Sequence, residues 1–293
     1  MKPSQRLIYA GRIDKIVAYL AARLAEGVVP GLAELAGIAG LSEYHFHRVF
    51  RLMTGETLST TVQRLRLAIS ISALSPPTAA VADATARGAY ATTQSYARAL
   101  KARTGTVPTV ARGRPGEIER LQAYLRRPSP EESHVGVAPA VGVEIVSFDP
   151  LTIVALRNVG DYAELNGGYA RLFGLLPDAT AVTGLYGIPY DDPVETAAHL
   201  CRFDCCVSLS DRTGAFAVPE LRKLHIAAGP CARLRQTGSY KHMWRSLDSL
   251  YCYLLGASEW SFATAPPFVH YLDDPDLAAP DDLRADLYLP VIK

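Results

Sequence analysis

Side chains that can bind nucleic acid gather on one face of a helix predicted at residues 42–53. If Phe46, Val49 and Phe50 form the buried face of that helix, its remaining long side chains must face outward. This outward set is Glu43, Tyr44, His47, Arg48 and Arg51. Together these groups can hydrogen-bond to phosphates and to base edges in a major groove. An ordinary helical bundle with a polar face has the same spacing, so this pattern alone favours neither interpretation.

Charge is distributed very unevenly along the 293 residues. Residues 1–115 carry 15 Lys and Arg against 6 Asp and Glu, a net charge of +9, whereas the remainder carries −8 and the whole chain only +1. Such a division is typical of a half that binds a polyanion joined to a half with another task. It favours the DNA-binding interpretation of the helix at residues 42–53.

The elements that must position this helix follow a helical period. A short helix near Leu32 ends in the small-residue run Gly37 to Gly40, which makes a tight turn before residue 42. The period predicts further helices at residues 12–27, 58–74, 81–87 and 93–103. The last two of these partly repeat the helix-turn-helix arrangement. We expect a DNA-binding domain at 1–115 and a linker at 116–140, with one possible helix from 117 to 126.

The C-terminal half, expected as a domain at 141–293, is rich in aromatic residues and resembles itself at a shift of about 78 residues. Arg157-x-x-Gly160-x-Tyr162 matches Arg235-x-x-Gly238-x-Tyr240, and Arg202-x-Asp204 matches Arg284-x-Asp286. Within each copy the residue pattern predicts two strands, a helix and a third strand, in that order. The two copies together predict a pseudo-twofold α+β domain with one sheet.

Several classes of protein are excluded or disfavoured by composition. The chain is 49% hydrophobic, too apolar for a disordered protein, and it has no apolar run of the roughly 18 residues needed for a membrane helix. Its five cysteines are an odd number, which fits reduced thiols in a cytoplasmic protein without membrane contact. Cys201 and Cys205 have only His199 nearby, so we expect no metal site, no cofactor and no catalytic residue.

Residues 35–50, with Thr54-Gly55-Glu56 and Arg64 to Leu67, resemble the first helix-turn-helix and connecting helix of AraC-type transcription regulators. This resemblance covers roughly residues 8–112 and places Tyr44, His47 and Arg48 at DNA-contacting positions. It also implies that two helix-turn-helix units read successive major-groove segments. In the second unit the DNA-facing candidates are Gln94, Ser95 and Arg98. That unit departs from the family pattern, with Ala89 where Gly is usual, Leu100 where Phe is usual and Thr85 where Ala is usual.

Residues 141–293 resemble GyrI-like effector-binding domains through the repeated motif, Tyr186 to Pro193, Pro266-Pro267-Phe268 and Tyr288-Leu289-Pro290. The resemblance implies a small-molecule site between the two copies. Its candidate residues are Tyr162, Tyr186, Phe203, Tyr240, Trp244, Phe268, Val269, Asp286 and Tyr288. The family usually has an acid where this chain has Val269, which predicts neutral hydrophobic ligands in place of cations and a reversed preference in Val269→Glu. Asp286 is the best remaining acid, although an Arg-paired aspartate fits equally well.

These observations predict a multidomain protein: an all-α DNA-binding domain with two helix-turn-helix units, then a pseudo-twofold α+β GyrI-like domain. The expected function is a DNA-binding transcription regulator that senses a hydrophobic small molecule, with double-stranded DNA, the effector and RNA polymerase as partners. The rival interpretation is a GyrI-like small-molecule hydrolase or sequestering protein. The missing acid at Val269 counts against the enzyme, because hydrolysis needs an acid or base near a water.

Overall fold

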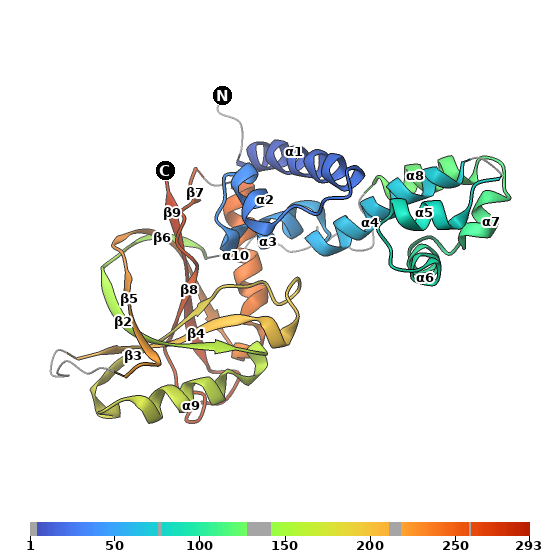
Figure 1. Cartoon of the computed structure of the whole chain (residues 1–293). Helices are drawn as coiled ribbons and strands as arrows, with labels where there is room; N and C mark the ends of the chain where they lie inside the picture. The colour runs from blue at the N-terminus through green and yellow to red at the C-terminus, as the bar shows by residue number, and fades with distance from the viewer. Residues whose placement is uncertain (1–4, 76–77, 128–141, 211–217, 258) are drawn as a thin grey trace. The chain divides into compact units, whose positions relative to one another are not determined.

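The computed structural model describes residues 5–75, 78–127, 142–210, 218–257 and 259–293 (Figure 1). The chain forms two compact units. The first comprises residues 1–9, 41–49 and 136–293, and the second comprises residues 10–40 and 50–135. Helices α1 and α3 contribute residues to both units.

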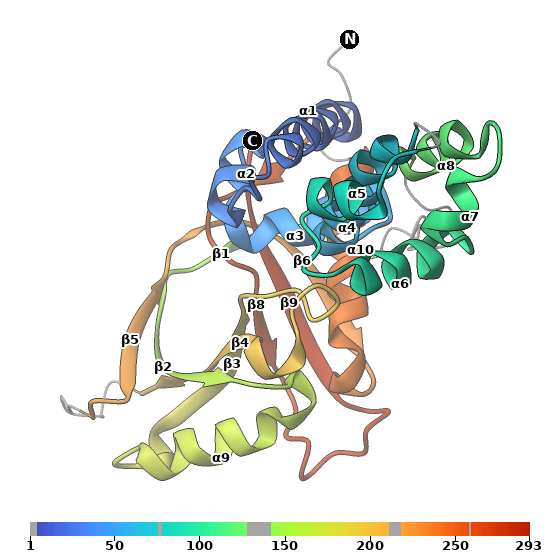
Figure 2. The same cartoon turned by 45° about the vertical axis from the view of Figure 1, so that its right-hand side comes forward.

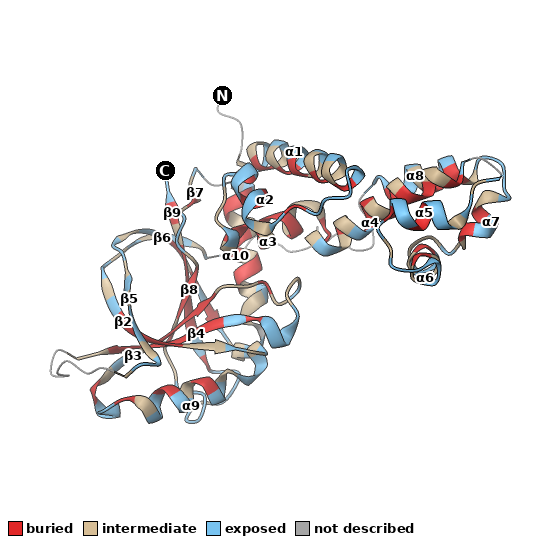
Figure 3. Cartoon of the chain, in the orientation of Figure 1, coloured by how far each residue is buried: buried red, intermediate tan, exposed pale blue. Residues whose placement is uncertain are grey.

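The second unit is helical throughout its described part. Its helices, including the two shared with the first unit, are α1 (Gln5–Ala25), α2 (Leu32–Ala39), α3 (Glu43–Thr54), α4 (Leu58–Ile71), η1 (Ser72–Leu74), α5 (Val81–Arg87), α6 (Thr93–Thr104), α7 (Pro108–Arg112) and α8 (Glu117–Leu125). The core around α4 buries Ile71, Tyr96 and Leu100 completely. Figure 3 shows buried residues in red along α4, α5 and α8. All the helices predicted from periodicity are present.

Helix α8 differs from the linker expected at residues 116–140. Its residues Ile118, Leu121 and Leu125 are buried in the same core as α4 and α6. The helix itself was predicted, but its apolar face was not recognised as a core face. Residues 117–125 are therefore an integral part of the second unit.

A buried ion-pair network joins three helices of this unit. Glu56, 1% exposed, accepts hydrogen bonds from Arg64 Nε at 2.9 Å and Arg103 Nη2 at 2.9 Å. Thr61 Oγ1 donates to the same carboxylate at 3.0 Å, and Arg64 Nη1 donates to the carbonyl of Leu125 at 2.7 Å. Because a buried charge is costly unless it is paired, this network fixes α4 against α6 and α8.

The first unit is built on one antiparallel sheet. Its strands are β1 (Glu144–Phe148), β2 (Leu151–Val159), β3 (Val182–Pro189), β4 (Arg202–Leu209), β5 (Leu221–Ile226), β6 (Gly229–Thr237), β7 (Ser261–Phe262), β8 (Phe268–Tyr271) and β9 (Arg284–Ile292). The spatial order is β1-β6-β9-β8-β3-β4-β2-β5, with β7 paired to β9. Helix α9 (Leu165–Leu175) packs on β2 and β4, and α10 (Met243–Ala257) packs on β6 and β9 (Figures 1 and 2).

The strand order reads symmetrically from its centre, where β8 pairs with β3. Each half of the order therefore corresponds to one sequence copy, except that the copies exchange their first strands. Strand β1 pairs with β6 of the second copy, and β5, which precedes β6, pairs with β2 of the first copy. The expected pseudo-twofold α+β domain is confirmed. The exchange of β1 and β5 and the two central strands, β3 and β8, were not predicted from the sequence.

The repeated motifs make the same contacts in both copies. Tyr162 Oη donates to the carbonyl of Arg202 at 2.7 Å, and Tyr240 Oη donates to that of Arg284 at 2.8 Å. The two arginines pair in turn with Asp191 and Asp273, each two residues after the end of the preceding strand, β3 or β8. The motif tyrosines thus tie the start of each copy's helix to its last strand.

Within the described ranges, no helix is both long enough and apolar enough to cross a membrane.

Candidate DNA-reading helices and effector face

The first helix-turn-helix depends on Gly40, which adopts a left-handed conformation with φ of 61° at the end of α2. A side chain is disfavoured in that region, so glycine permits the tight turn toward α3. On α3, Glu43 is exposed and Tyr44 and His47 are half-buried. These three placements agree with an outward face.

The expectation that Arg48 and Arg51 also face outward is wrong for this structure. Arg48 is 4% exposed and Arg51 is 1% exposed. Arg48 is buried because its Nη1 lies 2.5 Å from the Asp248 carboxylate of α10, within the first unit. Burial disfavours a charged guanidinium, but the carboxylates of Asp192 and Asp248 hold the pKa of Arg48 above its ordinary value.

The second helix-turn-helix, α5 and α6, belongs entirely to the second unit. Thr92 caps α6, and its side chain accepts from the Ser95 backbone N–H at 3.0 Å while the Ser95 hydroxyl accepts from the Thr92 N–H. Ser95 is therefore engaged in a capping box. Gln94 and Arg98 are both exposed and, four residues apart, share one helix face. They form the available polar face of α6.

The conformation of the turn between α5 and α6 requires glycine at residue 88 and strains Ala89. A Cβ on Gly88 would lie 2.8 Å from the Tyr90 ring and 2.9 Å from Ser70 Cβ, so only glycine fits. The next residue, Ala89, has a φ of 52°, the conformation that favours the glycine usual at this family position. The departure noted in the sequence thus falls on a strained residue.

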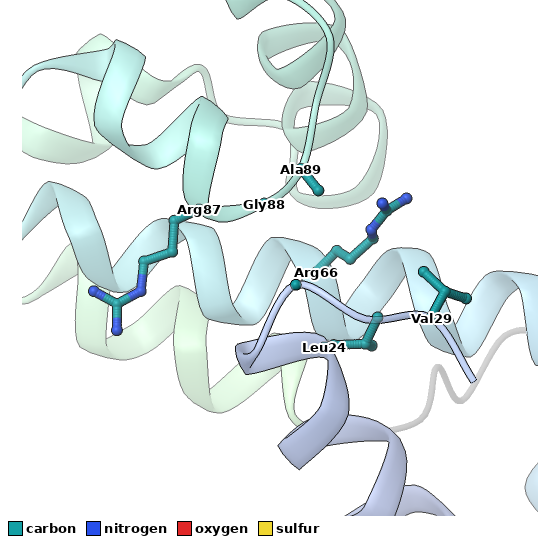
Figure 4. A pocket seen from close by; sticks show the side chains of 7 residues that line it. Leu24, Val29, Arg66, Arg87, Gly88 and Ala89 are labelled. Carbon is teal, nitrogen blue, oxygen red and sulfur yellow. The ribbon is translucent and has the colours of Figure 1, made fainter.

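A shallow surface depression lies beside this turn, and it is lined by Leu24, Gly27, Val29, Arg66, Arg87, Gly88 and Ala89 (Figure 4). Figure 4 shows the guanidinium groups of Arg66 and Arg87 pointing away from each other. They do not converge on a common ligand position.

Four of the nine candidate effector residues meet on one face of the sheet in the first unit, which we call the effector face. They are Tyr186, Phe268, Asp286 and Tyr288. The Phe268 and Tyr288 rings stack with centroids 4.8 Å apart and an interplanar angle of 9°. The register places Asp286 on the same side of β9 as Tyr288. These rings are buried, since Tyr186 is 8%, Phe268 2% and Tyr288 8% exposed, so the effector face is an aromatic core layer on one side of the sheet.

The other five candidates lie elsewhere. Phe203 and Tyr162 pack against each other on the side of the sheet covered by α9, Tyr240 contacts Tyr271, and Trp244 is on α10. Val269 pairs with Leu287 and alternates with Phe268, so its side chain points away from the effector face. Val269 therefore does not lie on the effector face, and Val269→Glu would place its carboxylate on the side of the sheet opposite Phe268.

Two residues of the effector face were missed. His270 stacks on Tyr186 with ring centroids 4.4 Å apart, and the Phe148 ring lies 4.8 Å from Phe268. Alternation along β8 would have found His270, because residues 268 and 270 must share a face. Burial lowers the pKa of His270 below its ordinary value, against the opposing influence of Asp286.

Carboxylates on the effector face are bound to arginines. Asp286 pairs with Arg235. Asp204, its counterpart in the first copy, is fully buried and accepts from Arg157 Nε at 2.5 Å and from Arg222 Nη2 at 2.6 Å. The Arg-paired alternative for Asp286 is the one observed. Neither carboxylate presents an uncompensated negative charge to a cationic ligand.

The cysteines of the first unit are free thiols. Cys201, Cys205, Cys206 and Cys231 are free and buried, and burial raises the pKa of the Cys205 thiol to about 12. Across the part of the chain that the structure describes, no three His, Cys, Asp or Glu side chains are grouped to hold a metal ion.

Comparison with known families finds a match for each of two parts of the chain. Residues 142–292 match the GyrI-like small molecule binding domain, and residues 35–114 match a helix-turn-helix domain. The chain belongs to the GyrI-like family. It carries an AraC-type helix-turn-helix DNA-binding domain followed by a GyrI-like small-molecule-binding domain.

One relative is the probable transcriptional regulator YgiV of Escherichia coli strain K12, 25% identical over 159 residues, which covers 51% of this chain and 95% of YgiV. Among solved structures, the EcmrR C-terminal domain has a TM-score of 0.41 at 16% identity, covering 52% of this chain and 97% of that chain. A hydrolase from Listeria innocua has a TM-score of 0.36 at 13% identity, covering 53% of this chain and 94% of that chain.

Proposed function

We propose that this chain is a transcription regulator that binds double-stranded DNA through residues 1–115 and a hydrophobic small-molecule effector on the effector face. The stacked rings of Phe268 and Tyr288, beside those of Tyr186 and His270, are the observation that carries the effector assignment. Because Asp204 and Asp286 already hold arginines, the favoured effector is neutral and aromatic, not a permanent cation.

The effector assignment is tested by calorimetric titration of the full chain with two ligands of similar size, one neutral and aromatic and one a quaternary ammonium. We expect tighter binding of the neutral ligand, and at least tenfold weaker binding in Tyr186→Leu. Tyr124→Leu, which changes an exposed tyrosine of α8, is the matched control and should leave the affinity unchanged. Preference for the cation would overturn the ligand class.

The DNA assignment rests on the net charge of +9 and on the exposed pair Gln94 and Arg98 of α6. If Arg98 contacts phosphate, Arg98→Ala should weaken DNA binding similarly on all sequences and reduce the slope of log K against log salt by about 1. Arg120→Ala removes another exposed arginine, on α8, and should have little effect. Equal losses in both variants would show that α6 is not part of the DNA interface.

RNA polymerase is the further partner we propose, to be tested by transcription in vitro from a bound promoter.

We further propose that the chain is not an enzyme. A hydrolase would need an acid or base poised beside a water, and the two best-placed carboxylates are engaged by arginines. His270 is the group of the effector face whose ordinary pKa lies nearest neutrality, which suits it to proton transfer. Hydrolysis of a reactive ester or epoxide that is abolished by His270→Ala would establish the rival function.

A further inference from the structure

The first half of α3 contacts the rest of the first unit through Arg48. Residues 41–49 belong to that unit, and Arg48 Nη1 donates to Asp248 Oδ1 at 2.5 Å and to the carbonyl of Trp244 at 3.3 Å. The two charged side chains are 4% and 2% exposed. The Arg48 guanidinium also lies 5.4 Å from the centre of the Tyr251 ring. All three partners are on α10.

His45, one turn before Arg48, is held by the same surface. Its Nε2 lies 2.9 Å from the carbonyl of Ala263 and 3.1 Å from that of Ala265, so Nε2 carries the proton and donates it. The Tyr251 hydroxyl then donates to Nδ1 at 2.6 Å. Every hydrogen-bonding position of this buried imidazole is therefore satisfied.

The same helix face is linked to the effector face. The Tyr44 ring lies 5.4 Å from that of Tyr190, and the Tyr190 hydroxyl donates to Asp204 at 2.7 Å. The Arg157 guanidinium, which pairs with Asp204, lies 4.3 Å above the Tyr190 ring. Tyr190 is therefore in contact with both the DNA-reading helix and the charged group beside the effector rings.

From these contacts we infer that α10 and Tyr190 form an intramolecular binding surface for the DNA-reading helix, in competition with DNA. This inference rests on the proposed function. A guanidinium that is 4% exposed and paired to Asp248 cannot reach a phosphate or a guanine, so Arg48 has two mutually exclusive partners. DNA binding then requires release of Tyr44, His45 and Arg48 from this surface. An effector that displaces Tyr190 favours the released state, because a ligand shifts an equilibrium toward the state it binds better.

The test compares Asp248→Asn with the unmodified full chain on short duplexes selected from a random-sequence pool. Loss of this carboxylate removes one of the two carboxylates, those of Asp192 and Asp248, that offset the buried charge of Arg48. This favours release, so we expect DNA affinity to rise about tenfold or more. Asp273→Asn is the matched control, because Asp273 is in the same unit and its ion pair joins it to Arg284 of β9 and not to α3. Its affinity should equal that of the unmodified chain.

A second readout is hydrogen exchange of the amides at residues 43–49, which should become faster in Asp248→Asn than in Asp273→Asn. Equal DNA affinity and equal exchange in both folded variants would overturn the inference while leaving DNA binding intact. Failure of every variant to select any duplex would overturn the proposed function itself. If Asp248→Asn does not fold, Tyr190→Ala serves as the second variant. It removes the Tyr44 contact and leaves the ion pair of Arg48 with Asp248 intact, and it should also raise the DNA affinity.

Discussion

At the scale of single residues, Ala89 is the one non-glycine with positive φ among the described residues. Its left-handed conformation costs an L-residue about 1 kcal/mol relative to glycine. We therefore expect Ala89→Gly to stabilise the second unit by somewhat less than about 1 kcal/mol, because glycine also gains entropy in the unfolded chain. Urea unfolding checks this. Gly88→Ala, which crowds the Tyr90 ring, should destabilise the same unit, and stabilisation by both changes would contradict the explanation.

His45 makes the first unit sensitive to acid. Burial lowers its pKa from 6.5 to about 4, although the carbonyls of Ala263 and Ala265 oppose this, and Arg48 lowers it further. Between these two values the unfolded chain binds the extra proton and the folded chain does not, so stability is greatest above pH 6.5 and falls as the pH drops toward 4. The full loss is about 3 kcal/mol.

Unfolding free energies of the unmodified chain and of His45→Gln between pH 4.5 and 7.5 measure this contribution. Glutamine can still donate to the Ala263 carbonyl but does not titrate, so the slope of stability against pH should become shallower. The other charged or titratable groups facing His45 are Arg48 of α3 and Tyr251 of α10, and neither titrates in this range. An unchanged slope would assign the acid sensitivity to a different group.

At the scale of elements, the carboxylate of Glu56 connects α4 to α6 and, through Arg64, to α8. Glu56→Gln leaves two arginines around a neutral amide, and we expect a loss of about 3 kcal/mol in the second unit. Glu117→Gln, which breaks a pair with the mostly exposed Arg120, should cost far less, because solvent screens an exposed ion pair. Chemical denaturation of both variants decides this, and equal losses would show that the Glu56 network is not a structural junction.

Periodicity and the internal repeat predicted most helices and the pseudo-twofold sheet, because both depend on local spacing. They could not predict the exchange of β1 and β5, since strand pairing is a long-range choice that the alternation of side chains leaves open. They could not predict the side of the sheet on which Val269 lies or the burial of Arg48, for related reasons. Val269 requires the register of β8, and the burial of Arg48 depends on Asp248, 200 residues later. Tyr186, Phe268 and Tyr288 were predicted from the resemblance to GyrI-like domains, and the register places them on one face of the sheet.

At the scale of the whole molecule, strand exchange makes the two copies depend on each other. Fragments 142–210 and 218–293 should each be largely unfolded alone, because β1 then lacks β6 and β5 lacks β2. When the fragments are mixed, we expect β-sheet circular dichroism and a cooperative thermal transition to return. A fragment that folds by itself would show that the exchanged strands are dispensable.

The position of β9 has a consequence for synthesis on the ribosome. This strand, the last of the sheet at Arg284–Ile292, lies between β6 and β8 in its interior. At ordinary translation speeds β1 is synthesised roughly 10–30 s before β9. During this interval the edges of β6 and β8 that later pair with β9 have no partner strand. Nascent chains of this protein should therefore depend on chaperones until residue 292 leaves the exit tunnel, and a slow codon placed within β9 should lower the soluble yield more than one placed in α1.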